Sequence, residues 1–261
     1  MSNSLNNADK HTIMDTIDVI EVFSSIQGEG ALVGYRQIFV RLSGCNLKCL
    51  YCDTANSQTC KAGFARLEHT PFRQDFIEEK NIMSVDYLAK HINNLLAWPH
   101  HSVSLTGGEP LLQADAAAQL ASKINAPIYL ETNGTLPEML DIILEHLKYI
   151  SMDIKLPSVF GASKNYWKEH SEFLKKAAKG HKNISVKIVI TGETTQEEVK
   201  TAIDIIADVS DKIPLIIQPV TLADSLRPIA FNTISPFFEI ALKKIADVRV
   251  IPQTHKTMEI I

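Results

Sequence analysis

Several features that define other protein classes are scarce in this sequence. No stretch of its 261 residues approaches the roughly 18 consecutive apolar residues that a membrane-spanning helix needs. The formal net charge is only -4, so there is no basic excess of the kind that nucleic acid attracts. We therefore expect neither a membrane-embedded protein nor a protein that binds nucleic acid directly.

Cysteine is also scarce, and its use argues against a disulfide-stabilised protein. The chain has four cysteines, and residues 1–16 are polar, without the apolar run of a signal peptide. Disulfide frameworks are typical of small secreted chains. We therefore expect reduced thiols, a cytoplasmic location and a disordered N-terminal tail over residues 1–16.

Three of the four cysteines are concentrated in one short segment. Cys45, Cys49 and Cys52 have the spacing C-x3-C-x2-C. A [4Fe–4S] cluster has four irons and usually takes four cysteine ligands. Three local thiolates would leave one iron open, so that the cluster could bind and activate a small molecule. Two weaker alternatives are a zinc site completed by Cys60 or a histidine, and buried thiols without a role.

Short β-prone runs end in polar residues at three later places, and two of these ends also contain glycine. These segments are Thr106-Gly107-Gly108-Glu109-Pro110, Glu131-Thr132-Asn133-Gly134 and Asp153-Ile154-Lys155. Glycine at a strand end allows positive φ angles and a close approach of a ligand to the backbone. Polar residues gathered at successive strand ends are what α/β barrels use for active sites.

The rest of the chain alternates between strand-like runs and helical patterns. The runs lie at residues 37–42, 103–106, 128–131, 149–154, 185–190, 214–218 and 247–251, and the helical patterns at 85–96, 114–123, 138–147, 196–209 and 236–246. This alternation predicts an α/β fold with an open parallel sheet wrapped by helices. About six such units are too few for eight strands, so we predict a partial (β/α)6 barrel in one domain, residues 17–261.

Two helix starts carry a capping signal. Ser84 precedes an apolar stripe with helical spacing and is expected to be an N-cap. Thr195 followed by Glu198 is a capping box.

Residues 55–83 interrupt the alternation, because they show little periodicity. We expect an inserted loop there, serving as a lid or as a docking surface for an electron donor. Cys60 lies in this segment, and we interpret it as a non-ligand.

The cysteine motif, with Tyr51 in its aromatic position, resembles the signature of the radical S-adenosylmethionine (SAM) enzymes. The resemblance extends from about residue 20 to about residue 255 and includes the GGEP segment. It implies a partial (β/α)6 radical SAM barrel and SAM bound to the open iron, with Glu109 holding the methionyl amino group. The implied SAM-binding residues are Tyr51, Cys52, Asp53, Gly107, Gly108, Glu109, Glu131, Asn133, Asp153, Lys155 and Gln218.

A second block, SIQGEG followed by VRLSGCNL-x-C-x-YCDT, resembles the 7-carboxy-7-deazaguanine synthase family. That family acts in queuosine biosynthesis, so the resemblance implies a lyase that contracts the ring of 6-carboxy-5,6,7,8-tetrahydropterin with loss of ammonia. It also implies that Thr54 ligates Mg2+. The implied substrate contacts are Ile26, Gln27, Gly28, Glu29, Gly30, Arg41, Thr106 and His255. From the residues alone, Arg41 could instead form a surface ion pair and Thr54 could cap a turn.

The resemblance further implies a homodimer and an electron donor of the flavodoxin or ferredoxin type. A glycyl-radical activase is the alternative enzyme, because it shares GGEP and Asp-Ile-Lys, but the IQGEG block argues against it. A regulatory or binding role without catalysis is a further alternative.

Overall fold

The computed structural model describes residues 15–58, 63–160, 164–180, 183–221 and 229–260. Within them, a ten-stranded sheet has the order β12-β11-β10-β9-β8-β7-β3-β2-β4-β5. Each neighbouring pair from β3 to β12 is parallel. These strands are β3 (Arg36–Leu42), β7 (Ser102–Gly107), β8 (Ile128–Thr132), β9 (Leu147–Ile154), β10 (Ile184–Ile190), β11 (Leu215–Pro219) and β12 (Val248–Val250). The seven strand-like runs and the open barrel are confirmed, since β5 and β12 form separate edges.

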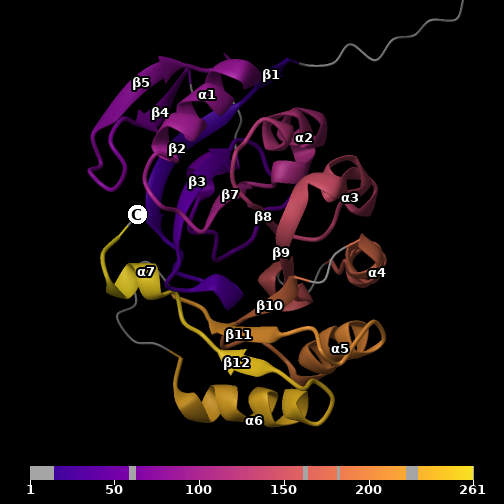
Figure 1. The fold of residues 1–261 in the computed structure, drawn as a ribbon. Coiled ribbons are helices and arrows are strands. Elements are labelled where there is room, and N and C mark those ends of the chain that lie inside the picture. Colours follow the sequence, from indigo (N-terminus) through magenta and orange to yellow (C-terminus); the bar gives the residue numbers. More distant parts are fainter. Residues whose placement is uncertain (1–14, 59–62, 161–163, 181–182, 222–228, 261) are drawn as a thin grey trace, which may run out of the picture.

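Helices connect these parallel strands and lie along one side of the sheet (Figure 1). They are α1 (Val85–Leu95), α2 (Ala114–Ser122), α3 (Pro137–Ile143), α4 (Trp167–Gly180), α5 (Gln196–Ala207) and α6 (Phe231–Leu242). Both predicted caps are present. Ser84 accepts a hydrogen bond from the Tyr87 amide, and Thr195 and Glu198 form a reciprocal capping box. A short helix, α7 (Thr254–Thr257), lies on the opposite side of the sheet.

Part of the predicted inserted loop is instead a hairpin that extends the sheet. β4 (Phe64–Glu68) pairs with β2 (Val19–Ile26) in parallel and with β5 (Phe76–Lys80) in antiparallel orientation. β2 itself pairs antiparallel with β3. Ala65 and Leu67 are buried while their neighbours Phe64 and Arg66 are exposed, but this alternation is too short to distinguish a strand from a loop by sequence. Cys60 lies outside the described residues.

Three further features differ from the sequence-based expectations, namely one additional helix, one helix start and the end of the N-terminal tail. Helix α4 was not predicted, although His170, Phe173, Leu174 and Ala177 form a buried stripe at helical spacing. Helix α6 begins at Phe231 rather than at Pro236, which lies inside it. Proline is favoured in a first turn, and that preference misplaced the start. Residues 1–14 of the expected tail lie outside the described part, and Thr16 belongs to β1 (Thr16–Ile17), which pairs with β6 (Met83–Ser84).

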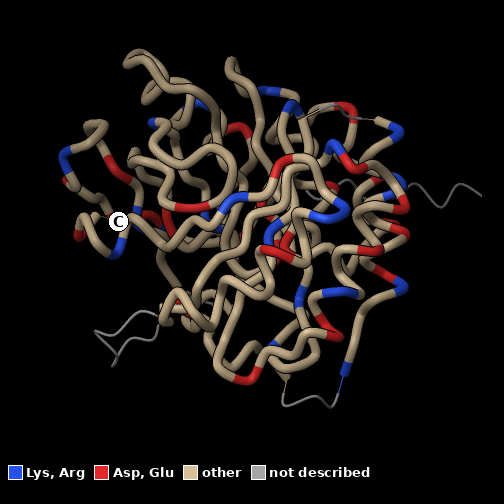
Figure 2. The backbone as a smooth tube through the Cα atoms, turned by 90° about the horizontal axis from the view of Figure 1, so that it is seen from below, with Lys and Arg blue, Asp and Glu red and all other residues tan. Residues whose placement is uncertain are grey.

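The remaining turns are 3-10 helices, η1 (Gly30–Leu32), η2 (Ala55–Ser57), η3 (Pro110–Gln113), η4 (Leu144–His146) and η5 (Pro157–Phe160). None of the helices in the described ranges combines the length and the apolar character needed to cross a bilayer. Figure 2 shows basic and acidic residues interspersed along the backbone.

Candidate active site

A cavity of about 390 Å³ lies on the inner side of the sheet, toward the carboxyl ends of the parallel strands. This is where parallel α/β folds place their ligands. Of the residues that the sequence assigned to the site, all but Gly30 and Glu109 line it. They are Ile26, Gln27, Gly28, Glu29, Arg41, Cys45, Cys49, Tyr51, Cys52, Asp53, Thr54, Thr106, Gly107, Gly108, Glu131, Asn133, Asp153, Lys155, Gln218 and His255.

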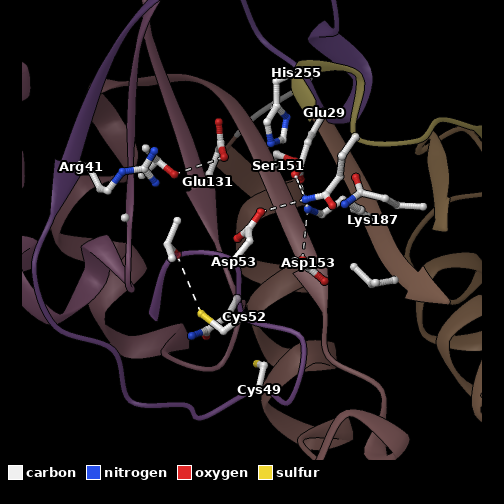
Figure 3. Close-up of a pocket in the computed structure, with 18 of the residues that line it drawn as sticks. Glu29, Arg41, Cys49, Cys52, Asp53, Glu131, Ser151, Asp153, Lys187 and His255 are labelled. Carbon is white, nitrogen blue, oxygen red and sulfur yellow. Dashed lines mark hydrogen bonds and ion pairs between the residues drawn. The ribbon is translucent and has the colours of Figure 1, made fainter. Parts of the chain in front are cut away.

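The three cysteines lie together in the loop after β3, and their thiols are free. Figure 3 shows Cys49 and Cys52 at one end of the cavity, and His255, Glu29 and Lys187 at the other. Burial raises the pKa of Cys45, and it raises the pKa of Cys49 to about 11. These groups therefore need a nearby positive charge to be stable as thiolates. Bound iron supplies that charge in a cluster site.

The double glycine after β7 supports the cysteine loop directly. A side-chain carbon on Gly107 would clash with the backbone of Leu42, and one on Gly108 would clash with the carbonyl group of Gly44. The Glu109 amide donates to the Gly44 carbonyl at 2.7 Å, and the Gly108 amide donates to the Leu42 carbonyl at 3.2 Å. Glycine is thus required for backbone to pack on backbone beside Cys45.

Glu109 itself does not face the cavity, which differs from its expected contact with SAM. Its carboxylate is fully buried and accepts hydrogen bonds from the Leu111 amide, the Thr132 hydroxyl and the Asn133 amide. Burial raises the pKa of Glu109 to about 7, although these hydrogen bonds act in the opposite direction. Glu109 therefore joins the end of β7 to the end of β8.

Gly30, the second residue outside the lining, opens the 3-10 helix η1 with a φ angle of 66°. A side-chain carbon there would lie 3.3 Å from the hydroxyl of Tyr129. Its role in the structure is to turn the chain after Glu29.

Gln27 and Glu131 form a polar network on the cavity wall. The Gln27 amide group donates to Glu131 at 2.7 Å and to Gln37 at 3.0 Å, while its oxygen accepts from the Glu29 amide. Glu131 also accepts from the Ser104 and Thr106 hydroxyls. Glu131 was assigned to SAM, but its partners Gln27 and Thr106 were assigned to the substrate.

Glu29 belongs to a buried network of ion pairs that the sequence did not reveal. Its carboxylate contacts Lys187 of β10, and Lys187 lies 3.3 Å from Asp153, which Lys155 also contacts at 2.8 Å (Figure 3). Burial acts to raise the pKa of Glu29, but the charge of Lys187 and hydrogen bonds from Lys187 and Gln253 lower it to about 2. Glu29 is therefore an ionised hydrogen-bond acceptor within the cavity.

The C-terminal segment closes this end of the cavity. Gln253 donates to Glu29 at 2.7 Å and to Asp53 at 2.9 Å, and the Thr254 amide donates to the Gly28 carbonyl at 2.9 Å. His255 follows and packs on Gly28 in the wall of the cavity, and its contact with the substrate stays a prediction.

The polar lining residues that were not predicted as site residues include Ser151, Lys187, Gln253 and Lys256. Gln253 and Lys256 stand beside the predicted His255, and Lys187 interrupts an apolar strand. A lysine within an otherwise apolar run was the available signal for Lys187.

The structure shows the neighbours of Arg41, the predicted contact of the substrate, and of Thr54, the predicted Mg2+ ligand. Arg41 donates to Glu21 at 2.9 Å, and with 18 % of its side chain exposed it faces the cavity rather than forming a surface ion pair. Thr54 precedes η2 without a side-chain cap, and its hydroxyl lies 3.8 Å from the Cys52 sulfur.

Glu29, Asp53 and His255 lie close enough together to bind a metal ion. Both carboxylates, however, already contact protein cations, Lys187 and Lys256, so we assign no metal to this group.

Three buried polar atoms on the cavity wall have no hydrogen-bond partner among the described residues. They are the Tyr51 hydroxyl, one carboxylate oxygen of Asp153 and the Gln218 side-chain oxygen. Buried polar groups without partners are rare in folded proteins, so these atoms fit a polar ligand. All three belong to residues that were assigned to SAM, whose ammonium and hydroxyl groups are hydrogen-bond donors.

Comparisons with known proteins agree with this geometry. Residues 39–206 match the Radical SAM superfamily. The chain is 42 % identical to a 7-carboxy-7-deazaguanine synthase of Geobacter sulfurreducens, over 91 % of this chain and 95 % of the relative. It is 33 % identical to one of Methanothermobacter thermautotrophicus, over 92 % and 96 %.

Solved structures agree on the fold. The crystal structure of QueE from Escherichia coli matches with a TM-score of 0.58 at 18 % identity, covering 91 % of this chain and 94 % of that one. A radical SAM methyltransferase from Sphaerobacter thermophilus matches with a TM-score of 0.54 at 9 % identity, covering 89 % and 77 %. The resemblance inferred from the sequence motifs is confirmed, and this chain belongs to the radical SAM superfamily and, within it, to the 7-carboxy-7-deazaguanine synthase family.

Proposed function

We propose that this protein converts 6-carboxy-5,6,7,8-tetrahydropterin to 7-carboxy-7-deazaguanine with release of ammonia, as a step of queuosine biosynthesis. One observation carries the proposal. Residues 26–29 of the IQGEG segment and the three cysteines, a combination typical of this family, line one cavity of small-molecule size, with Glu29 at one end and Cys49 and Cys52 at the other. A relative of this name that is 42 % identical over 91 % of the chain favours it over a glycyl-radical activase.

The cofactor residues have distinct tasks in this proposal. Cys45, Cys49 and Cys52 hold the cluster, while Tyr51 and Gln218 offer their unpaired polar atoms to SAM. When bound, the cluster and SAM together supply the radical that removes a hydrogen atom from the substrate. Thr54 is the proposed Mg2+ ligand, since it lines the cavity and a hard ion favours an oxygen ligand such as its hydroxyl.

The substrate residues bind and orient the pterin. Glu29 stays ionised and accepts from the ring N–H and amino groups. Both amide hydrogens of Gln27 are held by Glu131 and Gln37, so Gln27 contributes the free lone pair of its side-chain oxygen as an acceptor. Arg41 presents a planar fork to the substrate carboxylate, with one nitrogen already held by Glu21. His255 on Gly28 excludes water from this end of the cavity.

An electron donor of the flavodoxin or ferredoxin type is proposed to dock where the cysteine loop reaches the surface. Leu50, between two cluster ligands, is 78 % exposed. It lines a shallow hollow together with Lys48 and Lys164, and the described residues that line this hollow include no Asp or Glu. An apolar centre with basic neighbours suits an acidic redox protein that binds transiently.

A homodimer and a cytoplasmic setting are also proposed. The homodimer rests on the family resemblance alone. A reducing compartment fits the three free thiols.

Anaerobic turnover tests the proposed function. The reconstituted protein is incubated with SAM, Mg2+, a reductant and 6-carboxytetrahydropterin, and the products are identified by mass spectrometry. We expect SAM-dependent formation of 7-carboxy-7-deazaguanine. Cys49→Ala should abolish SAM cleavage, and Glu29→Ala should reduce product formation but retain the cluster. Deoxyadenosine without product would move the assignment to another substrate, and normal product formation by Cys49→Ala would disprove it.

A further inference from the structure

Lys187 is a charged residue inside the sheet that no motif of the sequence includes. It lies in β10, within the run Ile184-Ser185-Val186-Lys187-Ile188-Val189-Ile190, and its side chain is 14 % exposed. Burying a lysine is costly unless its charge is compensated. Lys187 has two compensating partners from different parts of the chain, Glu29 and Asp153.

The two partners do not depend on Lys187 equally. Asp153 also contacts Lys155 at 2.8 Å, so it retains a cation when Lys187 is removed. Among the described residues, Glu29 forms an ion pair with Lys187 and with no second lysine or arginine. The loss of Lys187 therefore acts chiefly on Glu29.

The contacts of Glu29 leave room for a ligand. Lys187 occupies one carboxylate oxygen and Gln253 donates to the other at 2.7 Å. An ionised carboxylate offers about four acceptor positions, so the two oxygens together retain free lone pairs. Glu29 lines the cavity, and these lone pairs are available to N–H donors there.

We propose that Lys187 is a positioning residue for the substrate, which clamps the Glu29 carboxylate against β10 so that its free lone pairs meet two N–H donors of the aminopyrimidinone ring. This rests on the proposed function. Lys187 acts through Glu29 and is not a catalytic residue. A purely structural lysine would neutralise buried charge without affecting the binding of one particular ring edge.

The test compares kinetic constants of the reconstituted holoenzyme for wild type, Lys187→Met and Lys187→Arg. We expect Lys187→Met to raise KM for the pterin about tenfold or more and to change kcat less than about threefold. A hydrogen bond to a charged, well-positioned acceptor contributes about this factor to binding. Lys187→Arg should restore KM to within about threefold of wild type, because it retains a cation and donors. Lys176→Met, which removes an exposed lysine paired with Asp141, is the matched control and should change neither constant.

A double-mutant cycle keeps the proposal testable if Lys187→Met leaves Glu29 charged and unpaired and so fails to fold. Glu29→Gln with Lys187→Met contains no unpaired charge, and it should have the KM of Glu29→Gln alone within about twofold. A further tenfold rise in that background would overturn the proposal, as would an unchanged KM in Lys187→Met. Absence of turnover by wild type would instead overturn the proposed function, and the substrate role of Lys187 with it.

Discussion

The imidazole of His255 packs so closely on Gly28 that no side-chain carbon fits between them. This contact joins the C-terminal segment to the IQGEG segment, and the hydrogen bond from the Thr254 amide to the Gly28 carbonyl reinforces it. Glycine is required here because the His255 side chain leaves no space for a side-chain carbon. Its own backbone conformation does not require glycine, since its φ angle is not positive.

Gly28→Ala should therefore displace His255 and open one end of the cavity. We expect kcat/KM for the pterin to fall about tenfold or more, since small misplacements of substrate-positioning groups have effects of this size. Iron content should be unchanged, because the cysteines lie at the other end. Gly63→Ala is the matched control, since no atom of the described residues lies within 4 Å of the added carbon. Equal activity of Gly28→Ala and wild type would show that His255 does not form the cavity wall in solution.

Gly108→Ala should affect the cluster instead. The added carbon meets the carbonyl group of Gly44, and the backbone next to Cys45 must move. We expect less iron bound per chain after reconstitution and a lower Tm than for wild type. Gly192→Ala, at a glycine with open space around it, should retain both. Full iron loading of Gly108→Ala would contradict the close packing of these two loops.

Glu109→Gln tests the structural role of that carboxylate. The amide replaces an acceptor that faces three donors, so at least one buried donor loses its partner. A buried unsatisfied group costs about 1–3 kcal/mol, and Tm should fall accordingly. Glu193→Gln, at an exposed position, should leave Tm unchanged. A Tm equal to that of wild type would mean that the carboxylate does not hold the ends of β7 and β8 together.

Titration of the Glu29 carboxylate should cause no pH dependence of KM near neutrality. Its pKa is lowered to about 2, so its stabilising effect is present above its ordinary pKa of 4.5 and is lost only as the pH falls through about 2. The charged and titratable groups that face it are Lys187, Asp153, Asp53, His255 and Tyr129.

We expect the Glu29 contribution to KM to be constant from roughly pH 6 to 9, measured as the ratio of KM between Glu29→Gln and wild type. In Lys187→Met, burial dominates and raises the pKa of Glu29, so KM should increase as the pH falls. A wild-type ratio that changes across this range would show that Glu29 titrates there.

Charge reversal at the surface of the cysteine loop tests the docking site. Lys48→Glu combined with Lys164→Glu should slow reduction of the cluster by an acidic flavodoxin about tenfold, because rim charges chiefly control association rates. Reduction by dithionite should be unchanged, since it needs no docking surface. Lys90→Glu, on helix α1, is the control. Equal slowing with both reductants would point to damage at the cluster rather than lost docking.

Local sequence patterns were sufficient to predict the parallel strands and to recognise the cysteine motif. Buried strands in such a sheet are apolar runs of a few residues, as in β8 and β10, and thus stand out from their surroundings. Hairpin β4–β5 is half exposed, so its alternation was too weak to recognise. Helix α4 carries a mostly apolar stripe at helical spacing, so its position is encoded in the local sequence as well.

The sequence by itself determined the family, the three cysteines and the strand ends whose polar residues line the cavity, because each of these is encoded by residues close together along the chain. Only the tertiary structure decided that Lys187 clamps Glu29, that Glu109 faces inward and that His255 covers Gly28. These contacts join segments far apart in the sequence, and they depend on the order of strands in the sheet and on the face to which each side chain points. A one-residue change in strand register would turn Lys187 to the other face, so no local pattern can predict its partner.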